Sequence, residues 1–543
     1  MFGAGGGTSS YKEAEETDLI ILWGSNARET HPIFFHHLLR GVRNGARLIA
    51  VDPRRTSSAE WADLWMGIDV GSDIALANAM AREIIHHDLI AGGFIARATT
   101  GYEEFARSVE SYTLERAEAE TGVPASAISE VALAYARAEK GMICWTLGIT
   151  EHHNATDNVL ALINLALLTG KVGRHGCGLN PLRGQNNVQG GGDMGAIPAR
   201  LPGFQDLEEP AIHAKFEKAW GGAQFPLKKG YHLSEMFEAM DHGELRAAYI
   251  VGENPARSEA DQTRAVRLLT GLDHLVVQDI FLTQTAQLAD VVLPAAAGWA
   301  ESEGTVTNSE RRVQRVRRAL DPPAGARDDI EIICEIARRL GSDWGHPTAE
   351  QVWDECRSLS PMHAGMAYFR LDELDGIQWP CPDESHPGTQ FLHARLWKDP
   401  VEGRPAPFHV VEHDPPVDRL TPEFPIRLTT GRRLDSFNTG VQTGEYTSPL
   451  RKSEAVLISP EDGRRLGILD GERVRAVSRR GSVEVPVRFD ATLRPGLAFM
   501  TLHFPDQVAT NILTIDATDP KSGTAEFKAS AIRIEQLAAV STT

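Results

Sequence analysis

Arg183 opens a polar, glycine-rich segment that runs to Asp193 with neither a helical nor a strand period. A guanidinium carries a planar fork of N–H donors, so an arginine here could hold a small carboxylate through two parallel hydrogen bonds. Glycine residues in such a segment let the backbone approach a ligand closely. The segment is therefore a candidate site for a small anion. The alternative is a surface arginine in an ordinary salt bridge.

A second group of candidates lies where two expected strands end. The segment from Gly24 to Thr30 occupies the phosphate-binding position of a dinucleotide fold but lacks the GxGxxG spacing, so NAD binding in the usual manner is poorly supported. Asp52, Pro53 and Arg54 follow the next strand, where an acidic residue often bonds a ribose or a base and an arginine can meet a phosphate. Plain turns would also account for both segments.

The histidines and cysteines form no metal-binding pattern. His152 and His153 are adjacent, so in a helix they would point about 100° apart and could not easily chelate one metal. We keep His152 as a residue that could line a site. An iron–sulfur cluster or a structural zinc needs several thiolates closing on one point, and the sequence has no CxxC or CxxxC pair. The five cysteines are Cys144, Cys177, Cys334, Cys356 and Cys381.

Charge and composition exclude several classes of protein. The 543 residues carry a net charge of −19, and phosphate backbones need a basic face, so nucleic acid is not an expected partner. No run of about 18 apolar residues occurs, so no membrane span is expected. The glycine-rich start has neither the basic nor the apolar region of a secretory signal. A sparse, odd number of cysteines favours reduced thiols and a cytoplasmic location.

The elements that must position these residues are expected to form two α/β blocks. Strands that follow one another with helices between them predict parallel sheets, and open α/β sheets bind ligands at the carboxyl ends of their strands. In the first block the expected strands are 18–24, 47–51 and 142–147, and the expected helices are 32–43 and 154–168. In the second block the expected strands are 247–251, 274–277 and 290–294.

The rest of the chain divides into a connector and a β-rich end. Residues 345–416 are irregular and rich in Pro, Trp and His, which is typical of a connector packed across other domains. After Phe424 short β patterns alternate with tight turns and predict a compact barrel. The expected domains are therefore an α/β domain over 1–185, a second α/β block over 186–340, a connector over 341–416 and a barrel over 417–543.

The string from Asn180 to Gly190, followed by Asp193, resembles the substrate loop of molybdenum or tungsten formate dehydrogenases, which belong to the bis-molybdopterin guanine dinucleotide family. Further matches stand in family order along essentially the whole chain. They are Trp23 to His31, Val51 to Arg54, Gly71 to Asp73, Gly148 to Thr150, Gly252 to Pro255, Gln278 with Asp279, Ala289 to Pro294, Glu301 to Thr305, Thr429 to Arg432, His503 with Phe504, Asn511 to Thr514 and Glu526 to Lys528.

The resemblance implies a fold, an activity and a set of site residues. The fold would be α/β, with two Rossmann-like parallel-sheet blocks followed by a C-terminal double-psi β-barrel. The chain would be an oxidoreductase that converts formate to carbon dioxide at a molybdenum or tungsten bis-molybdopterin guanine dinucleotide centre, with Arg183 as the catalytic-site residue that holds formate. The residues that would contact the cofactor are Gly24, Asn26, Glu29, Asp52, Pro53, Arg54, Gly71, Asp73, Gly148, Thr150, His152, Gln185, Gly252, Asn254, Gln278, Asp279, Thr430, Gly431, Arg432, His503, Asn511 and Lys528.

Two departures from the family pattern set further expectations. The family begins with a Cys-rich module for an iron–sulfur cluster, and next come part of the second α/β block and a Cys- or selenocysteine-His pair that serves the metal. Met1 aligns just after that pair, so the metal ligand and the cluster are expected upstream of Met1. The chain is then a truncated sequence, one half of a split subunit completed by another chain, or a remnant, and we expect little or no activity from it alone. The smaller departure is Arg311, where the wider superfamily often has a glycine.

The expected partners are formate and either an amino-terminal half or an electron-transfer subunit. Two other interpretations stay open. The first is another molybdopterin oxidoreductase such as a nitrate reductase, against which the formate-type loop at Arg183 argues. The second is a non-catalytic protein that only binds the cofactor.

Overall fold

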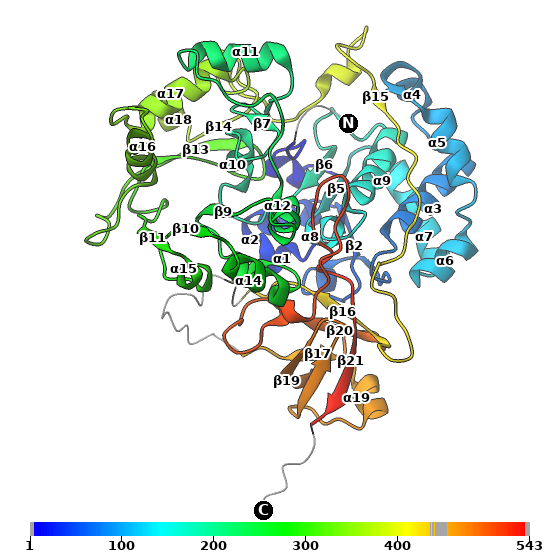
Figure 1. The fold of residues 1–543 in the computed structure, drawn as a ribbon. Coiled ribbons are helices and arrows are strands. Elements are labelled where there is room, and N and C mark those ends of the chain that lie inside the picture. Colours follow the sequence, from blue (N-terminus) through cyan, green and yellow to red (C-terminus); the bar gives the residue numbers. More distant parts are fainter. Residues whose placement is uncertain (1–4, 435, 437–438, 440–452, 538–543) are drawn as a thin grey trace, which may run out of the picture. The chain divides into compact units, whose positions relative to one another are not determined.

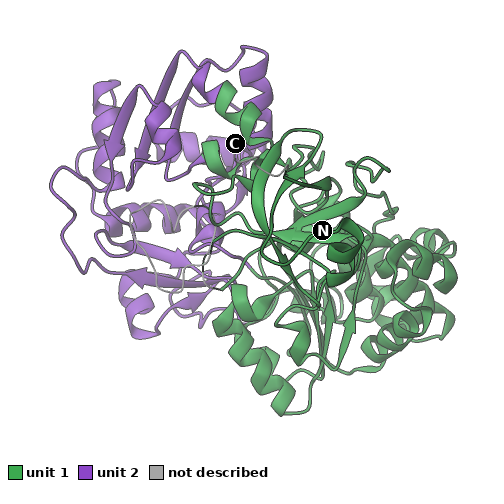
Figure 2. Ribbon diagram, turned by 90° about the horizontal axis from the view of Figure 1, so that it is seen from below, with its two compact units in different colours: residues 1–182, 255–267, 391–543 green, residues 183–254, 268–390 purple. Residues whose placement is uncertain are grey.

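The computed structural model describes residues 5–434, 436, 439 and 453–537 (Figure 1). The first four residues of the glycine-rich start lie outside this range. The chain forms two compact units, coloured in Figure 2. Unit 1 comprises Met1–Leu182, Pro255–Arg267 and Phe391–Thr543, and unit 2 comprises Arg183–Asn254 and Leu268–Gln390. No helix among the described residues is both long and apolar enough to cross a membrane.

A five-stranded parallel sheet organises the first part of unit 1. Its strand order is β3-β2-β1-β5-β6, so the sheet grows in one direction from β1 through β2 and in the other through β5. A ligand-binding sheet of this kind takes its ligand where the strand order reverses, which here is between β1 and β5. The strands are β1 (Leu19–Trp23), β2 (Arg47–Val51), β3 (Leu64–Met66), β5 (Gly141–Trp145) and β6 (Gly178–Pro181).

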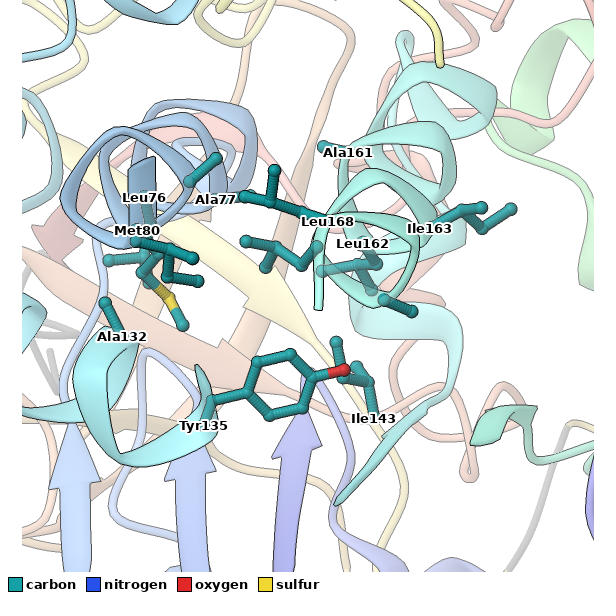
Figure 3. Packing of buried hydrophobic residues seen from close by; sticks show 14 of the residues in the cluster. Leu76, Ala77, Met80, Ala132, Tyr135, Ile143, Ala161, Leu162, Ile163 and Leu168 are labelled. Carbon is teal, nitrogen blue, oxygen red and sulfur yellow. The ribbon is translucent and has the colours of Figure 1, made fainter. Parts of the chain in front are cut away.

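Helices cover both faces of this sheet, which explains why its strands are continuous apolar runs. Alternate side chains of β1 point to opposite faces: Ile20 and Leu22 join one core cluster, and Leu19, Ile21 and Trp23 join the other. The first cluster includes side chains of α2 (Pro32–Arg43), and the second includes α3 (Asp73–His86), α7 (Ala125–Arg137) and α9 (Ala155–Leu168). Figure 3 shows part of the second cluster, with Leu76, Met80, Tyr135 and Leu162 packed together.

The predicted elements of this block are confirmed, except that the strand expected over 142–147 ends at Trp145 and Leu147 begins a short helix. Pro32 begins α2 because its fixed φ and missing N–H suit the first helical turn, and the helix ends before Asn44 and Gly45. Helix α9 is buried along most of its length, as its all-round apolar pattern predicts. The remaining elements of this block are η1 (Tyr11–Glu15), α1 (Ala27–Thr30), η2 (Ala59–Trp61), α4 (Gly92–Ala98), β4 (Thr99–Thr100), α5 (Tyr102–Val109), α6 (Leu114–Thr121) and α8 (Leu147–Thr150).

The C-terminal part of unit 1 is a closed six-stranded barrel, as predicted. Its strand order is β16-β20-β17-β19-β18-β21, with parallel pairing of β16 with β20 and of β17 with β19. Alternating valine, isoleucine and leucine side chains fill its interior. The strands are β16 (Ile426–Thr430), β17 (Val456–Ile458), β18 (Arg473–Val477), β19 (Ser482–Phe489), β20 (Leu497–Met500) and β21 (Ser530–Gln536), joined by α19 (Pro460–Leu466) and η4 (Thr510–Ile512).

Unit 2 contains the predicted second parallel sheet, in the order β11-β10-β9. Its strands are β9 (Ala247–Val251), β10 (His274–Asp279) and β11 (Val291–Pro294). A second, antiparallel sheet follows, formed by β12 (Gly304–Thr307), β13 (Arg312–Val316) and β14 (Ile377–Gln378). The helices and short strands around the two sheets are α10 (Val188–Asp193), β7 (Arg200–Leu201), β8 (Gln205–Asp206), α11 (Pro210–Ala219), α12 (Leu233–Asp241), α15 (Gln284–Leu288), α16 (Asp329–Arg339), α17 (Ala349–Leu359) and α18 (Tyr368–Glu373).

The stretch at 183–193 is not a loop throughout, because α10 occupies its second half. Helix α10 lies close to β12: Asn187 Oδ1 accepts a hydrogen bond from the Thr307 backbone at 2.9 Å. A Cβ on Gly190 would fall 2.0 Å from that same oxygen, so the close approach needs glycine. Tertiary packing therefore stabilises a helical turn that the low helix propensity of glycine argued against.

The stretch expected to be an irregular connector contains two helices, α17 and α18. The Thr348 hydroxyl caps α17 by accepting the Gln351 N–H, and Gln351 Oε1 in turn accepts the Thr348 N–H. This Thr-x-x-Gln capping box was visible in the sequence. The same stretch also carries η3 (Ala394–Trp397) and β15 (Ala406–Pro407), which belong to unit 1, as do α13 (Pro255–Ser258) and most of α14 (Gln262–Thr270).

Candidate functional site

Gly24 and Gly148 bring two loops of unit 1 into backbone contact where the strand order reverses. Gly24 follows β1 and has a φ of +56°, and the Gly148 N–H donates to its carbonyl oxygen at 3.2 Å. A Cβ on Gly24 would lie 2.8 Å from the Gly148 carbonyl carbon, and a Cβ on Gly148 would lie 2.5 Å from the Gly24 oxygen. Both positions therefore require glycine, and the two loops meet at the edge where open α/β sheets bind ligands.

Asp52 lies at the carboxyl end of β2 with an oxygen available to a ligand. Its Oδ1 accepts the Arg54 backbone N–H at 2.9 Å, and its Oδ2 accepts no hydrogen bond from any residue that the structure describes. Burial raises the pKa of this carboxyl to about 6, although the charges of Arg54 and Lys528 pull it down. A half-buried carboxylate with an open oxygen suits a ligand that presents N–H donors. Pro53 is half-buried between Asp52 and Arg54.

Arg54 extends over the Phe499 ring of β20, with its guanidinium carbon 3.6 Å from the ring centroid. Its guanidinium donates no hydrogen bond to any described residue, and burial lowers its pKa. A Cβ on Gly431 would clash with the Phe499 ring at 2.7 Å, so the chain after β16 can lie against this ring only as glycine. An arginine held flat on an aromatic ring, with its donors uncommitted, suits phosphate oxygens or a stacked base.

Lys528 adds a second positive charge near Asp52. Its ammonium lies 2.8 Å from Glu151 Oε2 and donates to the Thr430 carbonyl oxygen at 3.1 Å. Thr430 is the last residue of β16, and its hydroxyl donates to the Phe527 carbonyl oxygen at 3.0 Å. The barrel thus places a lysine and a strand end beside the edge of the five-stranded sheet, all within unit 1.

His152 and His153 converge on one buried carboxylate rather than pointing apart. They lie in a turn, and the Nδ1 atoms of His152 and His153 lie 3.7 Å and 2.8 Å from Glu526 Oε1. Burial alone would raise the pKa of Glu526, but the two histidines lower it to about 2, and Glu526 in turn raises the pKa of His153. His152 Nε2 also contacts the Gly148 carbonyl oxygen at 3.1 Å. Glu526 therefore fixes both rings beside the Gly148 loop.

Asp73 and Gly71 position the start of α3. Asp73 is buried and accepts the Trp23 indole N–H at 2.8 Å, which ties α3 to the end of β1. Burial raises the pKa of Asp73. Gly71 has a φ of +83°, and a Cβ there would fall 2.6 Å from the Pro416 ring. These two residues hold the backbone of this corner in place.

Asn26 and Glu29 bond to the segment that follows β2. Asn26 Oδ1 accepts hydrogen bonds from the Ser57 and Ser58 hydroxyls and from the Ser58 N–H. Glu29 accepts the Ser57 hydroxyl at 2.7 Å and the Leu434 N–H at 3.2 Å. Both side chains join the loop after β1 to neighbouring segments of unit 1. Thr150 ends α8 and is half-buried.

Three further candidates lie on the barrel side of unit 1. Arg432 is half-buried, and burial lowers its pKa. His503 is buried, and its Nε2 accepts the Arg433 N–H at 3.0 Å. Asn511 donates to the carbonyl oxygens of Arg257 and Ser258, both at 3.0 Å, and so connects the barrel to α13.

Arg183 lies in unit 2. Part of its surface reaches solvent, but its guanidinium is packed against the protein and held by a hydrogen bond. Its Nε–H donates to Gln189 Oε1 at 3.2 Å, and its backbone N–H and carbonyl both bond to the Ser309 hydroxyl. Gln189 in turn donates to Asp193 Oδ1 at 2.9 Å. Burial lowers the pKa of Arg183, but an arginine remains charged. Gln185 is exposed between Arg183 and α10.

The sheet of unit 2 presents a glycine and an acid at adjacent strand ends. Gly252 follows β9 with a φ of +63°, and its N–H donates to the Gln278 carbonyl oxygen at 2.8 Å. Asp279 ends β10, accepts the Phe281 N–H at 3.1 Å and is half-buried, and burial raises its pKa. Gln278 and Asn254 are engaged by the protein: Gln278 bonds Tyr249 and Asp329, and Asn254 bonds Gln284 and Thr285.

The candidates fall into separate groups. In unit 1 the residues that share one sheet edge are Gly24, Asp52, Arg54, Asp73, Gly148, His152, Thr430, Gly431 and Lys528. Those in unit 2 are Arg183, Gln185, Gly252, Asn254, Gln278 and Asp279. Phe499 and Glu151, which contact the candidates, were not selected from the sequence. Gln189, Asp193 and Glu526 stood inside matched motifs but were not named as site residues. The spacing of Gln189 and Asp193, four residues apart, was the one signal available.

The donor set of unit 1 fits one arm of a pterin guanine dinucleotide. Guanine offers two neighbouring N–H donors, which a carboxylate such as Asp52 accepts, and a pyrophosphate suits Arg54 and Lys528. The described residues contain no group of three or more His, Cys, Asp or Glu side chains placed to hold a metal ion. The chain can therefore hold a bulky polyanion through its loops, and no cluster of its described side chains forms a metal centre.

Two family descriptions match this chain. The one described as Molybdopterin oxidoreductase matches residues 4–339, and the one described as Molydopterin dinucleotide binding domain matches residues 426–531. The second range covers the barrel from β16 to the start of β21, and the first contains both parallel sheets.

Relatives match nearly the whole chain. Formate dehydrogenase 2 subunit alpha of Methanococcus maripaludis is 40% identical over 540 residues, which is 99% of this chain and 79% of that protein. Formate dehydrogenase H of Escherichia coli is 38% identical, over 99% of this chain and 75% of that protein. The assimilatory nitrate reductase catalytic subunit of Bacillus subtilis is 34% identical, over 98% of this chain and 76% of that protein.

Among solved structures, acetylene hydratase from Pelobacter acetylenicus has the same fold. It superposes with a TM-score of 0.74 at 19% identity, over 98% of this chain and 79% of that one. The fold, the family matches and the whole-length relatives agree. The chain belongs to the molybdopterin oxidoreductase family.

Proposed function

We propose that this chain is the catalytic subunit of a formate dehydrogenase and that Arg183 holds formate. Three observations support this proposal. They are the oriented guanidinium of Arg183, the formate-type loop around it, and relatives named as formate dehydrogenases that match 99% of the chain. The observation that carries the proposal is the Arg183 Nε–H bond to Gln189, because it fixes the plane of the guanidinium. A carboxylate binds best to a fork whose orientation is already set.

The cofactor in this proposal is a bis-molybdopterin guanine dinucleotide with molybdenum or tungsten. Asp52 would accept the guanine N–H donors of one dinucleotide, and Arg54 and Lys528 would neutralise its pyrophosphate. Asp279, at the end of β10 beside Gly252, has the same character and would serve the guanine of the second. When bound, the metal and its pterins would take up the two electrons released as formate becomes carbon dioxide and a proton. The protein binds and orients; the cofactor performs the redox chemistry.

The proposal assigns no metal ligand to the five cysteines of this chain. A cysteine binds metal as a thiolate, and burial raises the pKa of Cys144 to about 12 and that of Cys356 to about 11. Cys177, Cys334 and Cys381 are buried as well. We therefore propose that residues outside these 543, on the same polypeptide or on a partner, supply the metal ligand and an iron–sulfur cluster, and that an electron-transfer subunit receives the electrons. All five thiols are free, which supports a cytoplasmic location.

Activity of a complemented enzyme tests this function. The chain would be fused to the part of E. coli formate dehydrogenase H that it does not match, and the pterin content of the product measured first. Loaded protein should reduce a viologen dye with formate, and Arg183→Ala should lower kcat/KM at least about a hundredfold, since charge-assisted hydrogen bonds are lost. Arg200→Ala, which removes an arginine paired with Asp206 in the same unit, is the matched control. Loaded protein that reduces nitrate but does not oxidise formate would overturn the proposal.

A further inference from the structure

Helix α10 places two buried polar side chains on one face, four residues apart. Gln189 is 4% exposed and Asp193 is 1% exposed, although the helix carries three consecutive glycines. Buried polar groups cost free energy unless their hydrogen bonds are satisfied, so such a pair needs a reason. Arg183 donates to Gln189 and Gln189 donates to Asp193, so these hydrogen bonds run from Arg183 into the interior of unit 2.

Asp193 fixes which way the Gln189 amide faces. An ionised carboxylate only accepts hydrogen bonds, and Asp193 receives one on each oxygen: Gln189 Nε2–H at 2.9 Å and the Trp379 indole N–H at 2.8 Å. Because the NH2 group of Gln189 is turned toward Asp193, its Oε1 faces away and accepts the Arg183 Nε–H at 3.2 Å. A reversed amide would set donors against donors at Arg183 and leave Asp193 without one of its partners.

Buried residues hold Trp379, the partner of Asp193, in place. Trp379 is 1% exposed, and Arg311, which is fully buried, donates hydrogen bonds to the Trp379 and Thr389 carbonyl oxygens. The outer end is held through Ser309, which bonds the backbone of Arg183 but not its guanidinium. Gln189 therefore holds the Nε edge of the guanidinium, and Ser309 holds the backbone of Arg183.

We propose that Gln189 and Asp193 are positioning residues for Arg183, acting as a hydrogen-bond relay that sets the plane of its guanidinium. The relay rests on the proposed function for its purpose, which is to hold the guanidinium of Arg183 in the orientation that binds formate. An arginine side chain loses several rotamers when it is held, and the relay holds it before the substrate arrives. Asp193 acts at a distance, since it touches Gln189 and not the guanidinium.

Asp193→Asn disturbs the relay without changing the shape of the side chain. Its amide has a single acceptor oxygen, yet Trp379 and Gln189 both supply donors. Either the Trp379 bond is lost, or Gln189 turns over and presents NH2 to Arg183. Gln189→Met removes the acceptor in a second way, with a side chain of similar length. Ser309→Ala is the matched control, because it removes hydrogen bonds from the same arginine but leaves the guanidinium held.

Nuclear magnetic resonance of the full chain, with 15N-labelled arginine, reads the relay directly. The Nε–Hε signal of Arg183 is identified by its loss in Arg183→Lys. We expect this signal to shift and its Hε to exchange faster with water in Asp193→Asn and Gln189→Met, and to stay unchanged in Ser309→Ala. Saturation-transfer measurements with sodium formate as the probe should show binding weakened about tenfold in the two relay variants, as for loss of one hydrogen bond to a charged group.

An unchanged Arg183 signal in both relay variants overturns the proposal, and so does an equal shift in Ser309→Ala. If Asp193→Asn fails to fold, Gln189→Met alone decides between these results. Wild-type protein that shows the expected signals but binds no formate would leave the relay intact and remove the proposed function instead. Different results therefore overturn the relay and the proposed function.

Discussion

Replacing Asp52 by asparagine should make the protein more stable while weakening its hold on guanine. Burial raises the pKa of the Asp52 carboxyl from its usual 3.8 to about 6, so its ionised form costs free energy in the folded chain at neutral pH. At about 1.4 kcal/mol per pKa unit, the full difference corresponds to about 3 kcal/mol. Asp52 keeps part of its surface open to solvent, and screening reduces the expected gain to roughly 1–3 kcal/mol.

The stability gained by replacing Asp52 with asparagine depends on pH. Between pH 3.8 and about 6 the folded chain binds the Asp52 proton more tightly than the unfolded chain does. Wild-type stability from this group therefore falls as pH rises through that window and is constant above it. Asparagine does not titrate, so the advantage of the variant is full above about pH 6 and disappears below about pH 4.

Guanine binding should change in the opposite direction. A carboxylate accepts both neighbouring N–H donors of guanine, whereas an amide offers one acceptor and turns a donor toward the other N–H. Loss of one charge-assisted hydrogen bond, with a donor left facing a donor, should weaken binding at least about tenfold. Adenine presents no such pair of donors, so binding of an adenine nucleotide should not fall.

Urea unfolding at pH 4, 6 and 8, with calorimetric titration of GDP and ADP, measures both effects. Glu60→Gln is the control, because it removes the same charge from an exposed carboxylate of unit 1. A variant that is less stable than wild type at pH 8, or that gains equally at pH 4 and pH 8, would refute the electrostatic argument. GDP binding that survives unchanged would refute the assignment of Asp52 to guanine.

Three further changes test other parts of the structure. Gly24→Ala should destabilise by roughly 1–3 kcal/mol more than Gly467→Ala in urea unfolding, because both residues have similar left-handed φ values and only the first Cβ would overlap backbone; equal losses would contradict the close approach. Arg311→Ala should cost roughly 3–5 kcal/mol, since this buried guanidinium donates to three backbone carbonyl oxygens, and a loss under about 1 kcal/mol would contradict it. Glu526→Gln should lower the free energy of unfolding by roughly 2–3 kcal/mol near pH 6. This deficit should shrink as pH falls from 4.5 towards 2, where the wild-type carboxylate takes up its proton, and again above the raised pKa of His153. A deficit independent of pH would rule out the ion pair.

The fold was predictable where local signals agree with burial. The apolar run at Leu19–Trp23, the proline that opens α2 and the turn residues of the barrel each determine their element locally. Helix α10 was not predictable, because its glycines favour a loop and only packing against β12 makes it helical. Arg311 stands where the wider superfamily often has a glycine, and it has a left-handed φ. Glycine adopts that conformation without strain.

The candidate site was predictable only in part, for a similar reason. The place of Asp52 and Arg54 follows from the end of a strand, which the sequence reveals. The stacking of Arg54 on Phe499 and the approach of two histidines to Glu526 depend on where the barrel closes against the sheet in unit 1. Contacts between residues so far apart in sequence leave no local pattern.

The pterin content of the purified chain tests the central claim most directly. The chain would be produced in a host that makes molybdopterin guanine dinucleotide, and the released pterin oxidised to its fluorescent form and counted together with guanine. We predict pterin and guanine in equal amounts, approaching two of each per chain, and a reduced content in Asp52→Asn and in Asp279→Asn. A folded chain without pterin, from a host in which a control molybdopterin enzyme is fully loaded, would contradict the account.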